Sequence, residues 1–432
     1  MALSPAVAAR AFARRPVARR RLWAAGRRLM DVQGKQAATA RRRVRGHLHE
    51  NDLGQLLILR VNELRWNSSL EHFLRRLRPG GVVIDAPLTG GAETVCEFLF
   101  KLACAVPAVP FLALGEEGGA MDPLRAFLPP LPSPRAVAGM GLASVRRLGE
   151  LVGAALQLTG FNTDLAPLLD LAASQGRGCE PVENPCRGTP WRAPTGETAA
   201  TRPFSRDPQL VAKCGAAFLD GLERHEVRAC GKHFPGFPIA QSSNAMEPLV
   251  VSKSMAQLWR EDLVPYRALL PRLPLVLLST AAYKAYDFDL PQSAGLSPKV
   301  VEGLLRAKLG YNGVAIAYGL ETEAVRGTLS LEEAAVQALR AGCDMVLLEK
   351  AEAAERVHGA LSAARDSGKL PSDRVELALK RIQLAKKGLK PPRGRLSRRS
   401  LERLVREFKD FSGGFTDNGK IENRKSKLEN GK

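Results

Sequence analysis

A lysine and a histidine close an apolar run just past the middle of the chain. Residues 231–237 read GKHFPGF, so Lys232 and His233 stand where the run meets a Pro-Gly break. Side chains of these types can bind an anion or transfer a proton. Further along, residues 313–320 read GVAIAYGL, and this run ends in Tyr318 and Gly319 without a carboxylate. The first run indicates the mouth of an active site, and the second run brings no carboxylate to it.

Short apolar runs of this kind recur along the chain and alternate with amphipathic helical patterns. Near-continuous apolar character is typical of strands that are covered on both faces. The eight runs are 56–61, 82–87, 111–115, 163–171, 228–234, 274–280, 313–318 and 344–350. Helix-start signals, Asp207-Pro208 and Ser330 with Glu333, precede two of the helical segments. The count of eight predicts an α/β fold of the (β/α)8 TIM-barrel type rather than a doubly wound open sheet.

In a barrel of this type, the chemistry lies at the C-terminal ends of the strands and in the loops that follow them. This rule selects a small set of positions as site candidates. They are 115–120, Asp170, Lys232, His233, Tyr283 and 318–321. A long loop, 171–206, follows the fourth run and is expected to lie over the same mouth.

The basic character of the protein is confined to its two ends. The whole chain has a net charge of +20, yet residues 1–45 carry +12, residues 386–432 carry +9 and residues 46–385 carry −1. A barrel without a positive stripe is not expected to bind nucleic acid, whereas the tails could contact acidic partners. We therefore expect a disordered basic extension over 1–45, a barrel over 46–388, and a basic C-terminal tail over 389–432 that is a short helix and then disordered.

The cysteines and the hydropathy exclude several classes of protein. The seven cysteines are scattered, and no Cys/His group has the spacing of a zinc site, so we expect no metal and no cofactor. Cys179 and Cys186 bracket a Pro/Gly-rich loop, and a disulfide between them is left as an open alternative. The chain contains no run of about 18 apolar residues, so we expect no transmembrane helix. We expect a cytoplasmic monomer.

Six motifs, taken in order, resemble the landmarks of the family-3 glycoside hydrolases, most closely the single-barrel β-N-acetylhexosaminidases. They are EEGG at 116–119, FNTDLAPLLDL at 161–171, RPFSRDPQLV at 202–211, KHFPG at 232–236, DLVPYR at 262–267 and LSPKVVEGLLRAKLGYNGV at 296–314. The resemblance covers about residues 50–388, nearly the whole expected barrel. It implies retaining glycosidases with an aspartate nucleophile after strand seven and a His-Asp acid/base on a loop after strand five.

This chain departs from the family at both catalytic positions. Tyr318 occupies the place of the nucleophile. Ser242, Ser243 and Asn244 stand where Asp-Ser-His is expected, on a loop that is one residue shorter. Asparagine does not transfer a proton near neutral pH, and serine does not polarise a histidine as a carboxylate does. The resemblance therefore predicts a catalytically degenerate homologue.

The sugar-binding positions are only partly kept. Gly115 replaces an aspartate, while Ala120 and Pro123 replace arginines; Arg202, Lys232 and His233 match the family and are our candidates for substrate binding. Structural roles are open for the same residues. Arg202 could pair with Asp170, Glu117 could hold the EEGG turn through backbone amides, and Tyr318 could fill space. Without the lost carboxylates, we expect a more electropositive mouth.

Three functions follow as hypotheses. The first is a degenerate β-N-acetylhexosaminidase homologue that at most binds an anionic or N-acetylated sugar. The second is an active glycosidase on a carboxylated or amino sugar, with Tyr318 as nucleophile and Glu321 as its base. The third is a scaffold or interaction protein that acts through its basic tails.

Overall fold

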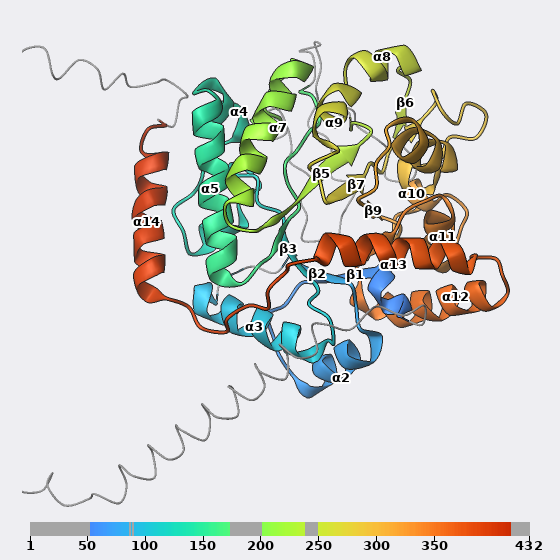
Figure 1. Cartoon of the computed structure of the whole chain (residues 1–432), viewed down its shortest axis with the longest axis horizontal. Coiled ribbons are helices and arrows are strands. Elements are labelled where there is room, and N and C mark those ends of the chain that lie inside the picture. Colours follow the sequence, from blue (N-terminus) through green and yellow to red (C-terminus); the bar gives the residue numbers. More distant parts are fainter. Residues whose placement is uncertain (1–51, 86–87, 89, 173–200, 238–248, 416–432) are drawn as a thin grey trace, which may run out of the picture. The chain divides into compact units, whose positions relative to one another are not determined.

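The apolar runs form the strands of a closed parallel barrel in the computed structural model, which describes residues 52–85, 88, 90–172, 201–237 and 249–415. The strand order is β1-β10-β9-β7-β5-β4-β3-β2. The predicted (β/α)8 barrel is confirmed (Figure 1). Its strands are β1 (Leu57–Val61), β2 (Gly81–Ile84), β3 (Phe111–Leu114), β4 (Thr163–Asp164), β5 (Arg228–Phe234), β7 (Leu275–Leu278), β9 (Val314–Ala317) and β10 (Met345–Leu348).

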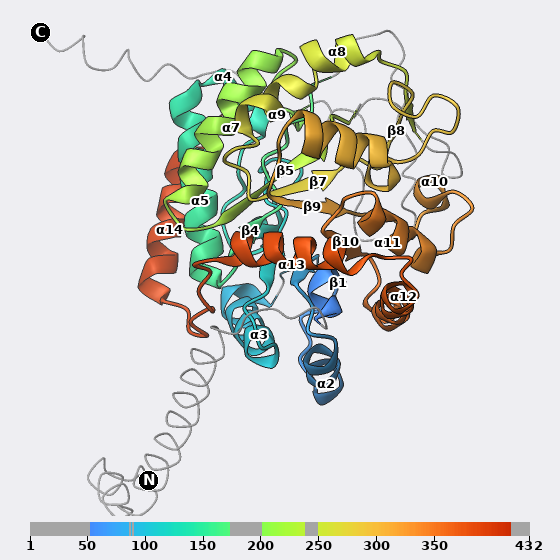
Figure 2. The same cartoon turned by 45° about the vertical axis from the view of Figure 1, so that its right-hand side comes forward.

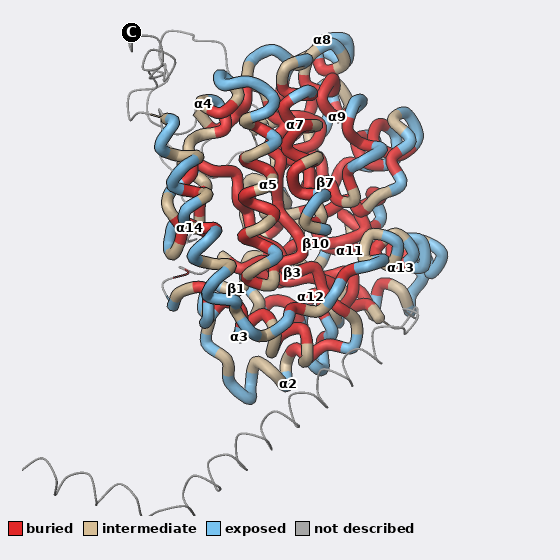
Figure 3. The backbone as a smooth tube through the Cα atoms, turned by 60° about the vertical axis from the view of Figure 1, so that its left-hand side comes forward, coloured by how far each residue is buried: buried red, intermediate tan, exposed pale blue. Residues whose placement is uncertain are grey.

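Helices cover the outside of the barrel. They are α2 (Ser68–Leu77), α3 (Gly91–Ala105), α4 (Pro134–Gly139), α5 (Leu142–Thr159), α7 (Pro208–Glu223), α8 (Met255–Arg260), α9 (Leu263–Leu269), α10 (Glu323–Arg326), α11 (Leu331–Arg340), α12 (Ala354–Asp366), α13 (Ser372–Lys386) and α14 (Arg398–Ser412). Short 3-10 turns lie at η1 (Leu53–Leu56), η2 (Pro123–Ala126), η3 (Ala294–Leu296) and η5 (Ala351–Ala353), and η4 (Lys299–Lys308) is a π-helix. Figure 3 shows buried strands inside and exposed outer helix faces.

The helix-start signals act as the sequence predicts. The Asp207 side chain accepts a hydrogen bond from the backbone N–H of Gln209 at 2.9 Å, and Pro208 opens α7. Ser330 and Glu333 form a capping box at the start of α11. Each cap satisfies backbone groups that the first helical turn leaves without partners. The two helices therefore begin where their sequences place them and lead the chain into the next strand.

The fourth run forms a much shorter strand than expected. Only Thr163–Asp164 pair as β4, although the apolar run extends to residue 171. Pro167 has no backbone N–H to donate and interrupts the ladder. The backbone remains attached to β5, because Lys232 donates its N–H to the Pro167 carbonyl at 3.2 Å and Leu169 donates to the Lys232 carbonyl at 2.7 Å. The end of β4 therefore stays next to Lys232.

The ordered structure continues past residue 388, where the sequence analysis ended the barrel. Helix α14 runs beside α5 in Figures 1 and 2 and buries Leu404 and Phe408. Arg147 of α5 donates to Glu407 of α14 at 2.8 Å. The prediction of a short basic helix in this segment is confirmed, and the helix packs on α5. Residues 1–45 and 416–432 lie outside the described residues.

Four further observations concern the described part of the chain. No helix in it is both long and apolar enough to cross a membrane, and its side chains form no group of three or more metal-binding residues. Its five cysteines, at 96, 104, 214, 230 and 343, are free. Cys179 and Cys186 lie outside it. Two short strands that the sequence did not indicate, β6 (Val250–Val251) and β8 (Ala282–Tyr283), pair with each other.

Candidate active site at the strand ends

The end of β5 carries two of the predicted site residues on one short segment. Lys232 and His233 are the fifth and sixth residues of β5, and both are buried. The turn that follows depends on Gly236, whose φ of 128° is a conformation that side-chain-bearing residues rarely adopt. A Cβ at this position would lie 2.5 Å from the Cβ of Asp262. Tyr283 donates its hydroxyl to the Gly236 carbonyl at 2.6 Å and fixes the turn.

A buried carboxylate joins the two basic candidates. Glu117 accepts two hydrogen bonds from Arg202, both at 2.7 Å, and its Oε1 lies 2.6 Å from Lys232 Nζ. Burial alone would raise the pKa of Glu117, but the charges of Arg202 and Lys232 lower it to about 2. The predicted pair of Arg202 with Asp170 is therefore wrong: the guanidinium forms its bidentate ion pair with Glu117.

The EEGG turn is also held differently from the prediction. Gly118 and Gly119 have positive φ values of 83° and 60°, as expected. Glu116, and not Glu117, bonds the turn: its carboxylate accepts the backbone N–H groups of Gly118 at 2.8 Å and Leu124 at 3.2 Å. Because Glu117 faces the cations, the mouth is less electropositive than expected, with one carboxylate against Arg202 and Lys232.

Asp170 holds the histidine and the loop after it. Its Oδ2 lies 2.6 Å from His233 Nδ1, and its Oδ1 accepts the backbone N–H groups of His233 at 3.1 Å and Phe237 at 2.8 Å. A carboxylate in this position orients the imidazole, as the aspartate of a catalytic dyad does. The interaction fixes the ring at the C-terminal end of β5 and ties the start of the next loop to β4.

Tyr318 lies over this histidine. Its ring is stacked on that of His233, with centroids 5.9 Å apart and an interplanar angle of 25°. β7 separates β5 from β9 in the barrel (Figure 2), so the two rings meet across the end of that strand. Burial raises the pKa of the Tyr318 phenol, and the negative charge of Asp170 raises it further, although Arg202 opposes them. A tyrosine nucleophile needs the opposite shift.

The structure brings five predicted positions to one end of the barrel. Arg202, Lys232, His233 and Tyr318 are linked by the contacts above, and Gly115 directly follows β3 at the same end. We call Glu117, Asp170, Arg202, Lys232, His233 and Tyr318 the strand-end cluster. Ser242, Ser243 and Asn244, the other predicted positions, lie outside the described residues.

A second group of charged residues at this end was missed. Arg60 of β1 pairs with Asp85 after β2 and with Glu349 after β10, each at 2.8 Å. Glu321 is close by, since its Oε1 accepts the backbone N–H of Glu349 at 2.7 Å. Burial, partly opposed by Arg60, raises the pKa of Glu349 to about 7. Asp85 directly follows β2 and Glu349 directly follows β10, so the strand-end rule that selected Tyr318 could have selected them too.

Glu321 is not placed as a base for Tyr318. Its Oε1 accepts the Glu349 amide and its Oε2 has no hydrogen-bond partner among the described residues, while the Tyr318 phenol bonds to Thr280. The other carboxylates near the phenol are also engaged, because Glu117 binds two cations and Asp170 binds His233 and two amides. The positive charge of Arg202 acts on Tyr318 and partly opposes the rise that burial causes in the pKa of its phenol. The cluster is therefore arranged to hold charges in balance rather than to activate the phenol.

Below the cluster, Asp164 is a fully buried carboxyl group. Its Oδ1 accepts the backbone N–H of Glu116 at 2.9 Å, and its Oδ2 has no hydrogen-bond partner in the described part of the chain. Burial raises the pKa of Asp164 to about 8, although the Glu116 amide and the charge of Lys232 oppose this. The group is thus protonated at neutral pH.

We expect the Asp164→Asn variant to lose part of the pH dependence of stability. An acid with a raised folded-state pKa binds more protons when folded, so its contribution falls as pH rises from about 4 to 8. At about 1.4 kcal/mol per unit of pKa, the contribution of Asp164 to the free energy of unfolding changes by several kcal/mol over this pH range. Urea unfolding of both proteins at pH 5.0 and 7.5 measures it, with the exposed Asp289→Asn as control. Equal slopes in all three proteins would contradict the assignment.

The sequence and the fold were compared with known proteins. Residues 192–385 match the glycosyl hydrolase family 3 N terminal domain. A β-hexosaminidase from Nitrosomonas eutropha is 27% identical over 277 residues, which is 62% of this chain and 73% of that protein. One from Pseudomonas aeruginosa (strain LESB58) is 28% identical over 317 residues, 72% of this chain and 82% of that protein.

Solved structures give the same result. The β-N-acetylglucosaminidase from Thermotoga maritima has a TM-score of 0.65 and 26% identity, and the match covers 78% of this chain and 68% of that one. CbsA from Thermotoga neapolitana has a TM-score of 0.66 and 27% identity, over 78% of this chain and 71% of that one. By sequence and by fold, the chain is similar to the N-terminal barrel of the family-3 glycoside hydrolases.

Proposed function

We propose that this protein is a degenerate homologue of the family-3 β-hexosaminidases, which binds a carbohydrate at the strand-end cluster without hydrolysing it. The observation that carries the proposal is Tyr318 at the end of β9, in the place of the family's nucleophile. Its phenol is stacked on His233 and its pKa is raised. Retaining glycosidases need a nucleophile and a separate acid/base, and the carboxylates of Glu117, Asp170 and Glu349 are each paired with a cation or with His233.

The same cluster keeps features that suit a sugar. Tyr318 and Phe237 both contact the His233 ring, with centroids 5.9 and 5.6 Å from it. Aromatic rings offer flat apolar surface, and the buried polar groups beside them orient a ligand. Arg202 and Lys232 lie beside these rings, and both are held by Glu117. An N-acetylated sugar, as the relatives' names suggest, or a sugar carboxylate fits this combination.

A paired set of Tyr318 variants tests the proposal. If the ring supplies stacking surface, Tyr318→Phe keeps the affinity for N-acetylglucosamine or glucuronic acid, and Tyr318→Ala weakens it roughly tenfold, about 1.4 kcal/mol. Isothermal titration calorimetry of the full-length protein measures both. If neither sugar binds the wild-type protein at millimolar concentration, sugar binding is rejected.

The active alternative makes a different prediction for the same pair. If Tyr318 were a nucleophile for a carboxylated or amino sugar, Tyr318→Phe would abolish turnover of the corresponding chromogenic glycoside while leaving its binding unchanged. We expect that the wild-type protein does not turn over such a glycoside, so Tyr318→Phe has no activity to abolish. The proposal of a scaffold acting through the tails stays a prediction, because 1–45 and 416–432 lie outside the described residues.

A further inference from the structure

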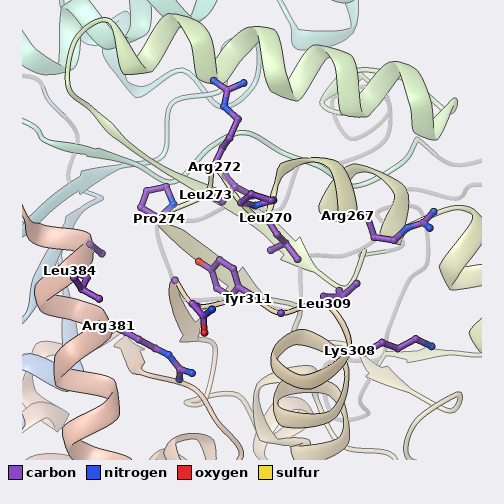
Figure 4. Close-up of a pocket in the computed structure, with 15 residues that line it drawn as sticks. Arg267, Leu270, Arg272, Leu273, Pro274, Lys308, Leu309, Tyr311, Arg381 and Leu384 are labelled. Carbon is purple, nitrogen blue, oxygen red and sulfur yellow. The ribbon is translucent and has the colours of Figure 1, made fainter.

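A cavity lies at the opposite end of the barrel from the strand-end cluster. It has a volume of about 650 Å³ and forms where the segments that precede β7 and β9 meet helix α13 (Figure 4). Small-molecule sites have volumes of roughly 300–1,000 Å³. We call this cavity the basal pocket. Four of its fifteen lining residues are cationic, namely Arg267, Arg272, Lys308 and Arg381, and none of the fifteen is acidic.

The wall formed by α13 is backed by an excess of positive charge. Asp344 receives three guanidinium groups, from Arg306 at 2.5 Å, Arg374 at 3.0 Å and Arg381 at 3.2 Å. One carboxylate against three arginines leaves a local charge of +2. Burial lowers the pKa of Arg381, and the like charges of Arg306 and Arg374 add to this against Asp344. An anion in the pocket would relieve this repulsion.

The opposite wall carries two cations, Arg267 and Lys308, that form no ion pair with a carboxylate among the described residues. The Arg267 guanidinium and the Lys308 ammonium lie 4.5 and 4.6 Å from the centroid of the Trp259 ring. A cation–π contact positions a charge but does not cancel it. Both side chains are exposed and point to the same side of the pocket in Figure 4. Arg272 differs, since it pairs with Asp220 and Glu223.

Between these walls the pocket is apolar. Leu270, Leu273, Leu309 and Tyr311 line it, and Leu384 of α13 is 67% exposed beside Arg381. A ligand that fits must therefore carry several negative charges close together and an apolar or ring-shaped part. Guanidinium groups match phosphate oxygens in geometry and charge. A ligand with a single carboxylate would neutralise only part of the positive charge of the pocket.

We propose that the basal pocket binds an organic diphosphate, with the phosphates at Arg267 and Lys308 and the ring of the ligand over the leucines towards α13. This site is separate from the strand-end cluster: its residues precede β7 and β9, whereas those of the cluster lie at or after the strand ends. The proposal does not depend on whether the cluster binds a sugar.

Calorimetric titration of the full-length protein with ADP, inorganic pyrophosphate and adenosine at low salt tests the proposal. We expect ADP to bind at least as tightly as pyrophosphate and adenosine not to bind at millimolar concentration. The double variant Arg267→Gln/Lys308→Gln loses two charged contacts and should bind ADP at least tenfold more weakly. Both residues are exposed, so thermal unfolding is expected to stay unchanged.

The matched control is Arg398→Gln/Arg399→Gln on α14, which removes the same charge from an exposed surface outside the pocket. It should bind ADP within twofold of the wild-type protein. Equal weakening in the two double variants would show non-specific attraction to a basic protein and overturn the proposal. Absence of ADP binding at 1 mM, or equal binding of adenosine, would overturn it as well. Binding that survives Tyr318→Ala confirms that the site is separate.

Discussion

The Glu117→Gln variant is expected to lose about 3–5 kcal/mol of the free energy of unfolding, the usual result of removing one partner from a buried ion pair. The side chains of Glu117, Arg202 and Lys232 are 2, 8 and 2% exposed. Glutamine keeps the shape of the side chain but leaves two cations without a counter-charge in a site that excludes water. Chemical denaturation at pH 7 measures the loss.

Two further variants show whether charge balance is the cause. Lys232→Met leaves Arg202 and Glu117 as a balanced bidentate pair, so it should cost less than Glu117→Gln. Glu71→Gln removes an exposed i,i+4 pair with Arg75 and should cost less than about 1 kcal/mol. If Glu117→Gln lowers the free energy of unfolding as little as Glu71→Gln does, the ion pairs of Glu117 with Arg202 and Lys232 do not stabilise the fold.

The wild-type protein should release product from a chromogenic N-acetylglucosaminide at least about 10³-fold more slowly than a competent relative. Loss of a nucleophile or its proton-transfer partner costs roughly 10³–10⁶ in rate, and losses within one catalytic unit do not add. Tyr318→Asp alone should therefore restore nothing, and neither should Asn244→His alone. Release of product under saturating substrate measures the rate for each protein.

Restoration requires the whole unit at once. The combined variant has Tyr318→Asp, Ser242→Asp and Asn244→His, with Gly115→Asp to bind the sugar, and only this set is expected to gain measurable turnover. A wild-type rate of about 1 s⁻¹ or more, within the ordinary range of enzymes, would contradict the proposed function. It would leave the diphosphate proposal for the basal pocket untouched.

The barrel could be predicted because its strands and helices carry local signals. β5 spans Arg228–Phe234, the bounds that its apolar run predicted, and Ser330 caps α11 as its spacing to Glu333 indicated. β4 stopped early because proline removed a donor from the ladder. β6 and β8 were missed because each has only two residues, too few for an alternating pattern to stand out.

The partners within the site could not be predicted in the same way. Arg202 has Asp170 and Glu117 as possible acids, and Glu117 lies 85 positions away in the sequence. Only the closure of the barrel decides which acid the guanidinium reaches. Asp170 was unavailable because His233 and two backbone amides already use its oxygens. Residue types at strand ends thus indicate where a site lies, while pairing depends on long-range geometry.

Helix α14 has a practical consequence for anyone who divides this chain into fragments. Phe408 is fully buried and Ser412 donates its hydroxyl to the Pro130 carbonyl at 2.7 Å. A fragment that stops near residue 390, where the sequence turns basic, would uncover the apolar surface that α14 covers on α5, and such patches promote aggregation. Its failure in a cellular assay would then report misfolding rather than a lost tail interaction. A cut after residue 415 removes C-terminal basic residues without exposing this surface.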